Sequence, residues 1–185
     1  MSKRFALFAS AAFLAFAAMA PAPLSAESMK EKTVNVGGAP MYPSKNIIQN
    51  AVNSKDHTTL VAAVKAAGLV DTLSGPGPFT VFAPTNAAFG KLPDGTVDNL
   101  VKPENKATLT RILTYHVVPS KLEASDLSDG KKLKTVEGEE LTVKKANGKV
   151  VIVDAKGGTA TVTISNVNQS NGVIHVVDTV LMPAS

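Results

Sequence analysis

The chain of 185 residues contains no cysteine, and this absence excludes several classes of protein. A disulfide scaffold, a thiol nucleophile and a cysteine-ligated metal site all need that residue. An exported domain without it must be held together by its apolar core alone. Hydrophobic residues make up 44% of the chain, and its length fits one domain better than two.

Strong charge of one sign is also missing. The formal net charge is +4, and Lys3 and Arg4 at the amino terminus contribute two of these charges. The remaining lysines form no basic stripe with interleaved aromatic residues, which is the pattern typical of nucleic-acid binders. We therefore expect no nucleic acid among the partners.

Only one long apolar run is present, at residues 5–20, and it follows the two basic residues. This pattern is typical of a secretory signal peptide. The run is short for a spanning helix, and prolines interrupt it directly afterwards. We predict a signal peptide over residues 1–26, cleaved after Ala26, and an exported protein, periplasmic or extracellular, without stable membrane insertion. Cleavage after Ala20 and an uncleaved membrane anchor are the alternatives.

Motifs for catalysis and metal binding are missing as well. The sequence has no His-x-x-x-His pair, no Gly-x-Ser-x-Gly elbow and no glycine-rich phosphate loop. A triad of Ser170, His175 and Asp178 exists only on paper, since a regular strand puts His175 and Asp178 on opposite faces. We expect His57 to be exposed in the first turn of a helix. The sequence thus predicts no enzyme, no cofactor and no metal site.

The segment after the leader, residues 27–42, has little hydrophobic periodicity and contains two adjacent glycines and a proline. We predict an extended lead-in without packed structure there, followed by one domain over residues 43–183.

Helical periodicity dominates the first half of that domain. We predict a short helix at 46–53 and a second one capped by Ser54 or Asp56. The second helix carries an apolar face and ends at Gly68, a residue suited to the left-handed conformation. Further helices are expected at 96–101 and from Pro103 to about Tyr115.

The second half alternates with the period of strands. Residues 141–144 and 149–154 flank Asn147-Gly148, a strong hairpin signal. Residues 159–164 read as a strand with one wet face, and residues 173–182, apolar on both faces, as a strand inside the core. The layout is α+β: an antiparallel β-sandwich or wedge with several short helices packed at one side.

Three motifs have an order and spacing of their own. Residues 79–89, FTVFAPTNAAF, form a strand that passes through Pro84 into a helix capped by Thr85. Residues 112–119 contain Tyr115-His116, and residues 171–183 read NGVIHVVDTVLMP. Together they resemble the first box, the tyrosine-histidine motif and the second box of the fasciclin (FAS1) domain. The resemblance covers residues 43–183 and implies the same α+β fold.

The resemblance implies adhesion rather than catalysis. In animal members of the family the tyrosine-histidine motif is implicated in integrin binding, and this assigns candidate partner-binding roles to Tyr115, His116 and Asp178, with Thr85 and Asn86 beside them. The family's aspartate-isoleucine pair reads Asp178-Thr179 here, which speaks against integrin. The structural interpretation is that Tyr115-His116 stabilises an apolar core.

We therefore expect an exported bacterial binding module whose partner is a cell-surface protein, a glycan or another copy of the chain. The alternative is an extracytoplasmic small-ligand carrier or enzyme that uses the same scaffold. A polar cavity around His116 or His175 would favour that alternative.

Overall fold

A computed structural model describes residues 32–184 of the chain. The predicted signal peptide over residues 1–26 and the first part of the lead-in lie outside the described residues. Within the part that is described, no helix is long and apolar enough to cross a membrane.

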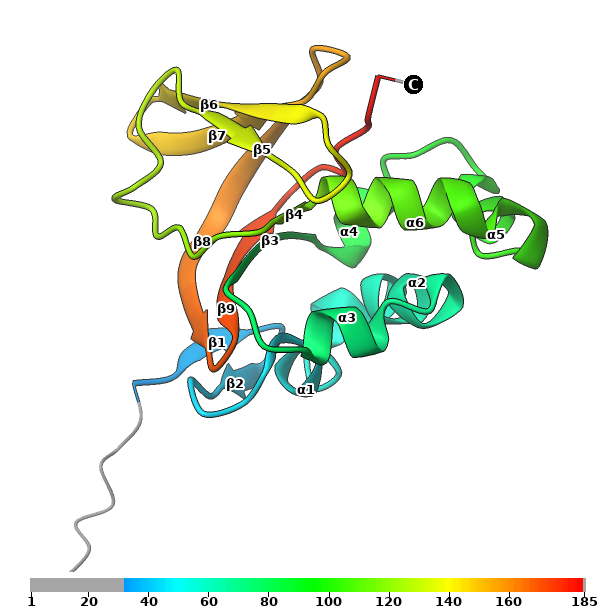
Figure 1. Cartoon of the computed structure of the whole chain (residues 1–185), viewed down its shortest axis with the longest axis horizontal. Coiled ribbons are helices and arrows are strands. Elements are labelled where there is room, and N and C mark those ends of the chain that lie inside the picture. Colours follow the sequence, from blue (N-terminus) through cyan, green and yellow to red (C-terminus); the bar gives the residue numbers. More distant parts are fainter. Residues whose placement is uncertain (1–31, 185) are drawn as a thin grey trace, which may run out of the picture. The chain divides into compact units, whose positions relative to one another are not determined.

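A sheet of seven strands forms the backbone of the fold (Figure 1). Its strands are β3 (Phe79–Pro84), β4 (Val117–Val118), β5 (Lys132–Lys134), β6 (Glu140–Ala146), β7 (Lys149–Val153), β8 (Thr159–Gln169) and β9 (Gly172–Val177). They lie in the order β4-β3-β9-β8-β7-β6-β5, and every neighbouring pair is antiparallel except β3 and β9. The prediction of an α+β fold with a mainly antiparallel sheet and short helices is confirmed, and the pairing of β3 with β9 adds one parallel pair that the sequence did not predict.

The sheet bends at β8, because this strand pairs with β7 at its start and with β9 along the rest of its length. Its start pairs with β7 at residues 159–161, and the rest pairs with β9. The register with β9 shifts twice, between Val162 and Ile164 and between Ile164 and Val167. Such irregularities bend a strand and increase its twist, so β5, β6 and β7 turn across the sheet in Figure 1.

Short helices gather beside β3 and β9 (Figure 1). They are α1 (Ile47–Ala51), α2 (Thr58–Ala67), α3 (Val70–Ser74), α4 (Asn86–Phe89), α5 (Thr96–Leu100) and α6 (Lys106–Tyr115), with 3₁₀ turns η1 (Lys55–His57) and η2 (Pro103–Asn105). Gly68 ends α2 with a φ of 72°, as the sequence predicts. The proposed cap at Ser54 is wrong, since its hydroxyl makes no capping bond to the helix.

The core lies on both faces of β3 and β9. Because side chains alternate along a strand, Val81 and Ala83 pack among the helices, whereas Phe82 packs among β5 to β8. All six residues of β9 are buried. The expectation of a strand inside the core is therefore confirmed, but it ends at Val177 instead of continuing to residue 182.

The lead-in contains a hairpin that the sequence did not predict. β1 (Val34–Val36) pairs with β2 (Ala39–Met41), and the side chains of Val36 and Met41 are buried in the core. Gly37 makes the contact possible: its φ is 59°, and a Cβ there would lie 2.3 Å from Ser54 Oγ. The expectation of an unpacked segment is wrong for the described residues, and the domain start at residue 43 stays a prediction.

Candidate functional site

The three motifs of the sequence lie side by side in the sheet. β3 pairs in parallel with β9, from Phe79 opposite Gly172 to Pro84 opposite Val177. On its other edge β3 pairs with β4, which follows the tyrosine-histidine motif directly. The topology thus brings together segments about 90 residues apart, in the order β4-β3-β9.

Parallel strands end at the same edge of a sheet, so Thr85 and Asp178 lie near one another after β3 and β9. The amide of Thr85 donates to the carbonyl of Val177 at 3.3 Å. The Thr85 hydroxyl accepts the amide hydrogen of Ala88 at 3.2 Å, which confirms the predicted cap of α4.

Asn86 holds the start of a different helix. Its Oδ1 accepts the amide hydrogen of Thr59 at 3.0 Å and the hydroxyl of Thr58 at 3.2 Å. Its Nδ2 donates to the carbonyl of Lys55 at 2.9 Å. The bonds to Oδ1 satisfy donors in the first turn of α2 that the helix leaves unpaired, so this oxygen has a structural role.

Asp178 divides its carboxylate between the fold and the surface. One oxygen, Oδ1, accepts the amide hydrogen of Thr161 at 2.8 Å and the Thr179 hydroxyl at 3.0 Å. The other lies 3.9 Å from Lys91 Nζ, in a pair with both side chains exposed. An exposed pair at that separation adds little to stability, so this side of the Asp178 carboxylate is open to a partner.

Tyr115 is completely buried and connects α6 to the far strands. Its hydroxyl accepts the amide hydrogen of Ala155 at 2.8 Å and donates to the carbonyl of Glu140 at 3.3 Å. Burial raises the pKa of this hydroxyl above its usual value, although the Ala155 amide works in the opposite direction. The phenol thus keeps its proton and serves as a fixed internal crosslink.

His116 is buried beside it in the neutral form. Its Nδ1 lies 2.8 Å from the carbonyl of Ile112, and its Nε2 accepts the amide hydrogen of Leu181 at 3.0 Å. A carbonyl can only accept, so the hydrogen is on Nδ1. Burial lowers the pKa of His116 to about 4, with smaller opposing effects of the Ile112 carbonyl and Asp154. The predicted hydrogen-bonded core histidine is confirmed.

His175 is also buried and neutral, and it does not meet Asp178. Its Nε2 donates to the carbonyl of Leu122 at 2.8 Å, and its Nδ1 accepts the amide hydrogen of Asn166 at 3.4 Å. Its ring stacks on Phe82 with the centroids 5.7 Å apart. Burial is the main reason that the pKa of His175 is lowered.

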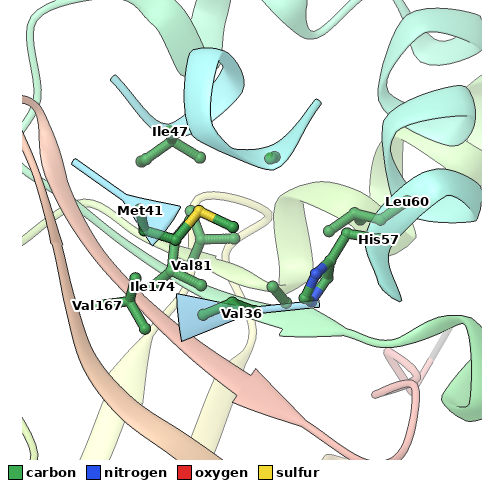
Figure 2. A pocket seen from close by; sticks show the side chains of 10 residues that line it. Val36, Met41, Ile47, His57, Leu60, Val81, Val167 and Ile174 are labelled. Carbon is green, nitrogen blue, oxygen red and sulfur yellow. The ribbon is translucent and has the colours of Figure 1, made fainter. Parts of the chain in front are cut away.

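His57 was expected at the surface, and this expectation is wrong: only 3% of it is exposed. Figure 2 shows its ring among apolar side chains that include Val36 and Met41 of the hairpin. Nδ1 lies 2.9 Å from Ser54 Oγ, while Nε2 has no hydrogen-bond partner among the described residues. Burial lowers the pKa of His57.

The cavities that His57 and His116 line are small and apolar. The one in Figure 2, at His57, has a volume of about 20 Å³, and a second, at His116, about 30 Å³. Each has room for little more than one water molecule. Among residues 32–184, no three histidine or acidic side chains converge as a metal site would require.

Sequence reasoning missed two polar residues that organise the motifs. Thr80 is completely buried in β3; its hydroxyl donates to the carbonyl of Ser120 at 2.6 Å and accepts the amide hydrogen of Leu122 at 2.8 Å. The Asn171 amide bonds to backbone atoms of Ile47 and Leu73. The sequence did contain a sign of both residues, since each is a polar residue in or beside an apolar strand.

Comparison with known proteins agrees with this geometry. The chain is 50% identical to Protein sll1483 of Synechocystis sp. over 153 residues, which are 83% of this chain and 82% of that protein. It is 39% identical to the immunogenic protein MPB70 of Mycobacterium bovis over 72% of this chain and 66% of that one. A porcine transforming growth factor-beta-induced protein, ig-h3, is 38% identical over 67% of this chain and 17% of its own length.

The fold is also found in a solved structure. A FAS1 domain pair from the insect cell adhesion molecule Fasciclin I superposes with a TM-score of 0.69 at 18% identity, over 83% of this chain and 58% of that chain. The model of the Fasciclin domain matches residues 55–183, which include all three motifs. The chain therefore belongs to the fasciclin domain family.

Proposed function

We propose that the chain is an exported, non-catalytic binding module that mediates adhesion outside the cytoplasm. One observation carries the proposal: the polar atoms of the three motifs are used inside the fold. Tyr115, His116 and Asn86 form hydrogen bonds with backbone atoms of other segments. A scaffold held in this way is suited to present a rigid surface, in which Tyr115, His116 and Asn86 have a structural role.

The relatives support a role at the cell surface. One, from Mycobacterium bovis, is named a cell surface glycolipoprotein, MPB83, and the solved insect protein is named a cell adhesion molecule. This protein would act in the same setting if residues 1–26 direct its export. A cell-surface protein, a glycan or a second copy of the chain would then be the partner.

The buried histidines argue against an enzyme. A general base must reach the proton that it removes, yet His116 and His175 hold backbone partners with both ring nitrogens. His57 Nε2 has no hydrogen-bond partner among residues 32–184, but the cavity that His57 lines has a volume of only about 20 Å³. An internal carrier of small molecules would need a larger cavity than those that His57 and His116 line.

Adhesion can be tested with beads that carry the full chain. The beads are incubated with intact cells that express the protein, and attached beads are counted with increasing salt and after washing. We expect retention above that of beads coated with heat-unfolded chain. Equal retention of folded and unfolded protein, or recovery of the chain only from the cytoplasmic fraction, would refute the proposal.

A further inference from the structure

A groove with a volume of about 460 Å³ lies beside the irregular part of β8, and its lining residues are outside the three motifs. Polar side chains line it from three segments: Lys32 before β1, Glu123 from the loop after β4, and Ser165, Asn166 and Asn168 from β8. We call it the β8 groove. Val34 and Met41 of the β1–β2 hairpin give it an apolar side. Its volume lies within the usual range for small-ligand sites.

The wall that carries Glu123 is fixed on both sides by buried groups. Before it, Leu122 is bonded through its amide to Thr80 Oγ1 and through its carbonyl to His175 Nε2. After it, the amide of Ala124 donates to Asn166 Oδ1 at 2.7 Å. The position of the Glu123 backbone is therefore set before a ligand arrives, which lowers the entropic cost of binding.

Asn166 shapes the adjoining wall, on β8. Its φ of 57° is left-handed, a conformation that asparagine tolerates better than most residues, and it coincides with the register shift of β8. The backbone amide of Asn166 donates to His175 Nδ1. The buried imidazole of His175 therefore bonds to both walls of the β8 groove, through Nε2 to Leu122 and through Nδ1 to Asn166.

Asn168 leaves a polar atom unpaired at this site. Its Oδ1 is buried and has no hydrogen-bond partner among residues 32–184, while its Nδ2 makes only a long contact of 3.5 Å to the carbonyl of Asn166. Exchanging the two amide atoms would set an oxygen against that carbonyl, so the unpaired atom is the acceptor. Buried acceptors without a partner are rare in folded proteins, and this one lies on a residue that lines the groove.

The charges of the groove point to an uncharged ligand. Lys32 and Glu123 form no ion pair with another residue in the described part of the chain, and their opposite charges balance within one site. The site also offers more acceptors than donors, through Glu123, Asn168 and the Ser165 hydroxyl. Addition of a peptide strand is disfavoured, because the irregular backbone at Asn166 interrupts the edge of β8.

We propose that the β8 groove binds one to two neutral sugar units of a surface glycan, an assignment that rests on the adhesive function proposed above. The Asn168 side chain turns towards the ligand, so that ligand hydroxyls donate to its Oδ1 and to the Glu123 carboxylate, and Lys32 donates to a ligand oxygen. The carbon face of the sugar ring packs on Val34 and Met41. Polyols match this lining, since each hydroxyl both donates and accepts.

The test uses the ¹⁵N-labelled full chain and four neutral trisaccharides: maltotriose, cellotriose, mannotriose and triacetylchitotriose. We expect at least one of them to shift the amide resonances of residues 122–124 and 165–168 in a saturable way. Asn168→Leu, which removes the unpaired buried acceptor, should leave the melting temperature unchanged or raise it while weakening this binding about tenfold. If Asn168 had a purely structural role, its replacement would not weaken binding while the melting temperature stayed the same or rose.

Two control variants separate the groove from general effects. Asn166→Gly and Asn147→Gly each replace a left-handed asparagine, but Asn147 lies in the β6–β7 turn. Only Asn166→Gly should weaken saccharide binding. The assignment is overturned if none of the trisaccharides shifts the groove resonances, if Asn168→Leu binds as the wild type does, or if the peptide Lys-Gly-Lys binds there in preference to the sugars.

The bead assay distinguishes failure of this assignment from failure of the adhesive function. If wild-type and Asn168→Leu beads adhere equally and the sugars do not bind, the groove assignment is overturned and adhesion stands. If the sugars bind in the groove while wild-type beads do not adhere, the adhesive function fails and the saccharide site stands.

Discussion

The backbone amide of Leu181 donates a hydrogen bond of 3.0 Å to Nε2 of His116, across 65 positions of sequence. The same ring donates from Nδ1 to the carbonyl of Ile112. The neutral imidazole thus joins the last turn of α6 to the segment that follows β9. A charged imidazolium carries a hydrogen on both nitrogens and would lose the bond to Leu181.

This relationship predicts a loss of stability in acid. The unfolded chain takes up a proton on His116 near its ordinary pKa, about 6.5, whereas the folded chain does so only at about 4. The stability that neutral His116 provides is therefore complete above pH 6.5 and is lost as the pH falls towards 4. This loss is a change of about 3 kcal/mol in the free energy of unfolding. Urea unfolding at about pH 7.5 and about pH 4.5 measures it.

His116→Gln provides the control for that experiment. Glutamine keeps a donor and an acceptor but does not titrate in this range. The free energy of unfolding should therefore depend less on pH in the variant than in the wild type. The same pH dependence in both proteins would contradict the role assigned to His116.

The cap that Asn86 places on α2 predicts a second effect. Asn86→Ala removes the acceptor for the amide of Thr59 and the donor to the Lys55 carbonyl. We expect the free energy of unfolding to fall by about 1–2 kcal/mol. Asn99→Ala, at an exposed position of α5, is the matched control and should change it by no more than about 0.5 kcal/mol. Similar losses of unfolding free energy in the two variants would show that the hydrogen bonds of Asn86 do not stabilise the fold.

The close approach of β3 and β9 predicts that Gly172 tolerates no side chain. A Cβ there would lie 2.0 Å from the carbonyl oxygen of Phe79, which is backbone and cannot move alone. Gly172→Ala should cost about 3 kcal/mol or more. Gly90→Ala meets its nearest atom at 3.4 Å and should stay within about 0.5 kcal/mol. Thermal unfolding compares them, and equal melting temperatures would argue against this packing.

The two tyrosines of the chain differ in what their hydroxyls do. Tyr115→Phe leaves the amide of Ala155 without its acceptor, and we expect a loss of about 1–3 kcal/mol. Tyr42 lies under Lys45 Nζ, 4.8 Å from the ring centre. Tyr42→Phe keeps that ring, so its free energy of unfolding should match the wild type. Chemical denaturation distinguishes the variants.

The features that the sequence predicted correctly depend on short segments. Thr85 caps the helix that it begins, Gly68 ends α2, and Asn147-Gly148 turns between β6 and β7. In each case the responsible atoms lie within a few residues of one another. The apolar character of residues 173–177 likewise identified a strand covered on both faces.

Several features that the sequence did not reveal involve partners that are distant in the chain. His57 looked exposed because nothing local covers it; the β1–β2 hairpin does so, since Gly37 lets the chain approach Ser54. Asn86 caps a helix that begins 28 residues earlier, and no local pattern reveals that bond. The left-handed Asn166 depends on the register of β8 against β9, which only the folded sheet sets.

If Tyr115, His116 and Asn86 only build the scaffold, the partner touches none of them. Bead adhesion by Tyr115→Phe, measured at a temperature where far-ultraviolet circular dichroism shows the variant to be fully folded, tests this role. We expect the adhesion of the wild type per folded molecule, together with a lowered melting temperature. Loss of adhesion at full folding, with the melting temperature unchanged, would refute the structural role of Tyr115.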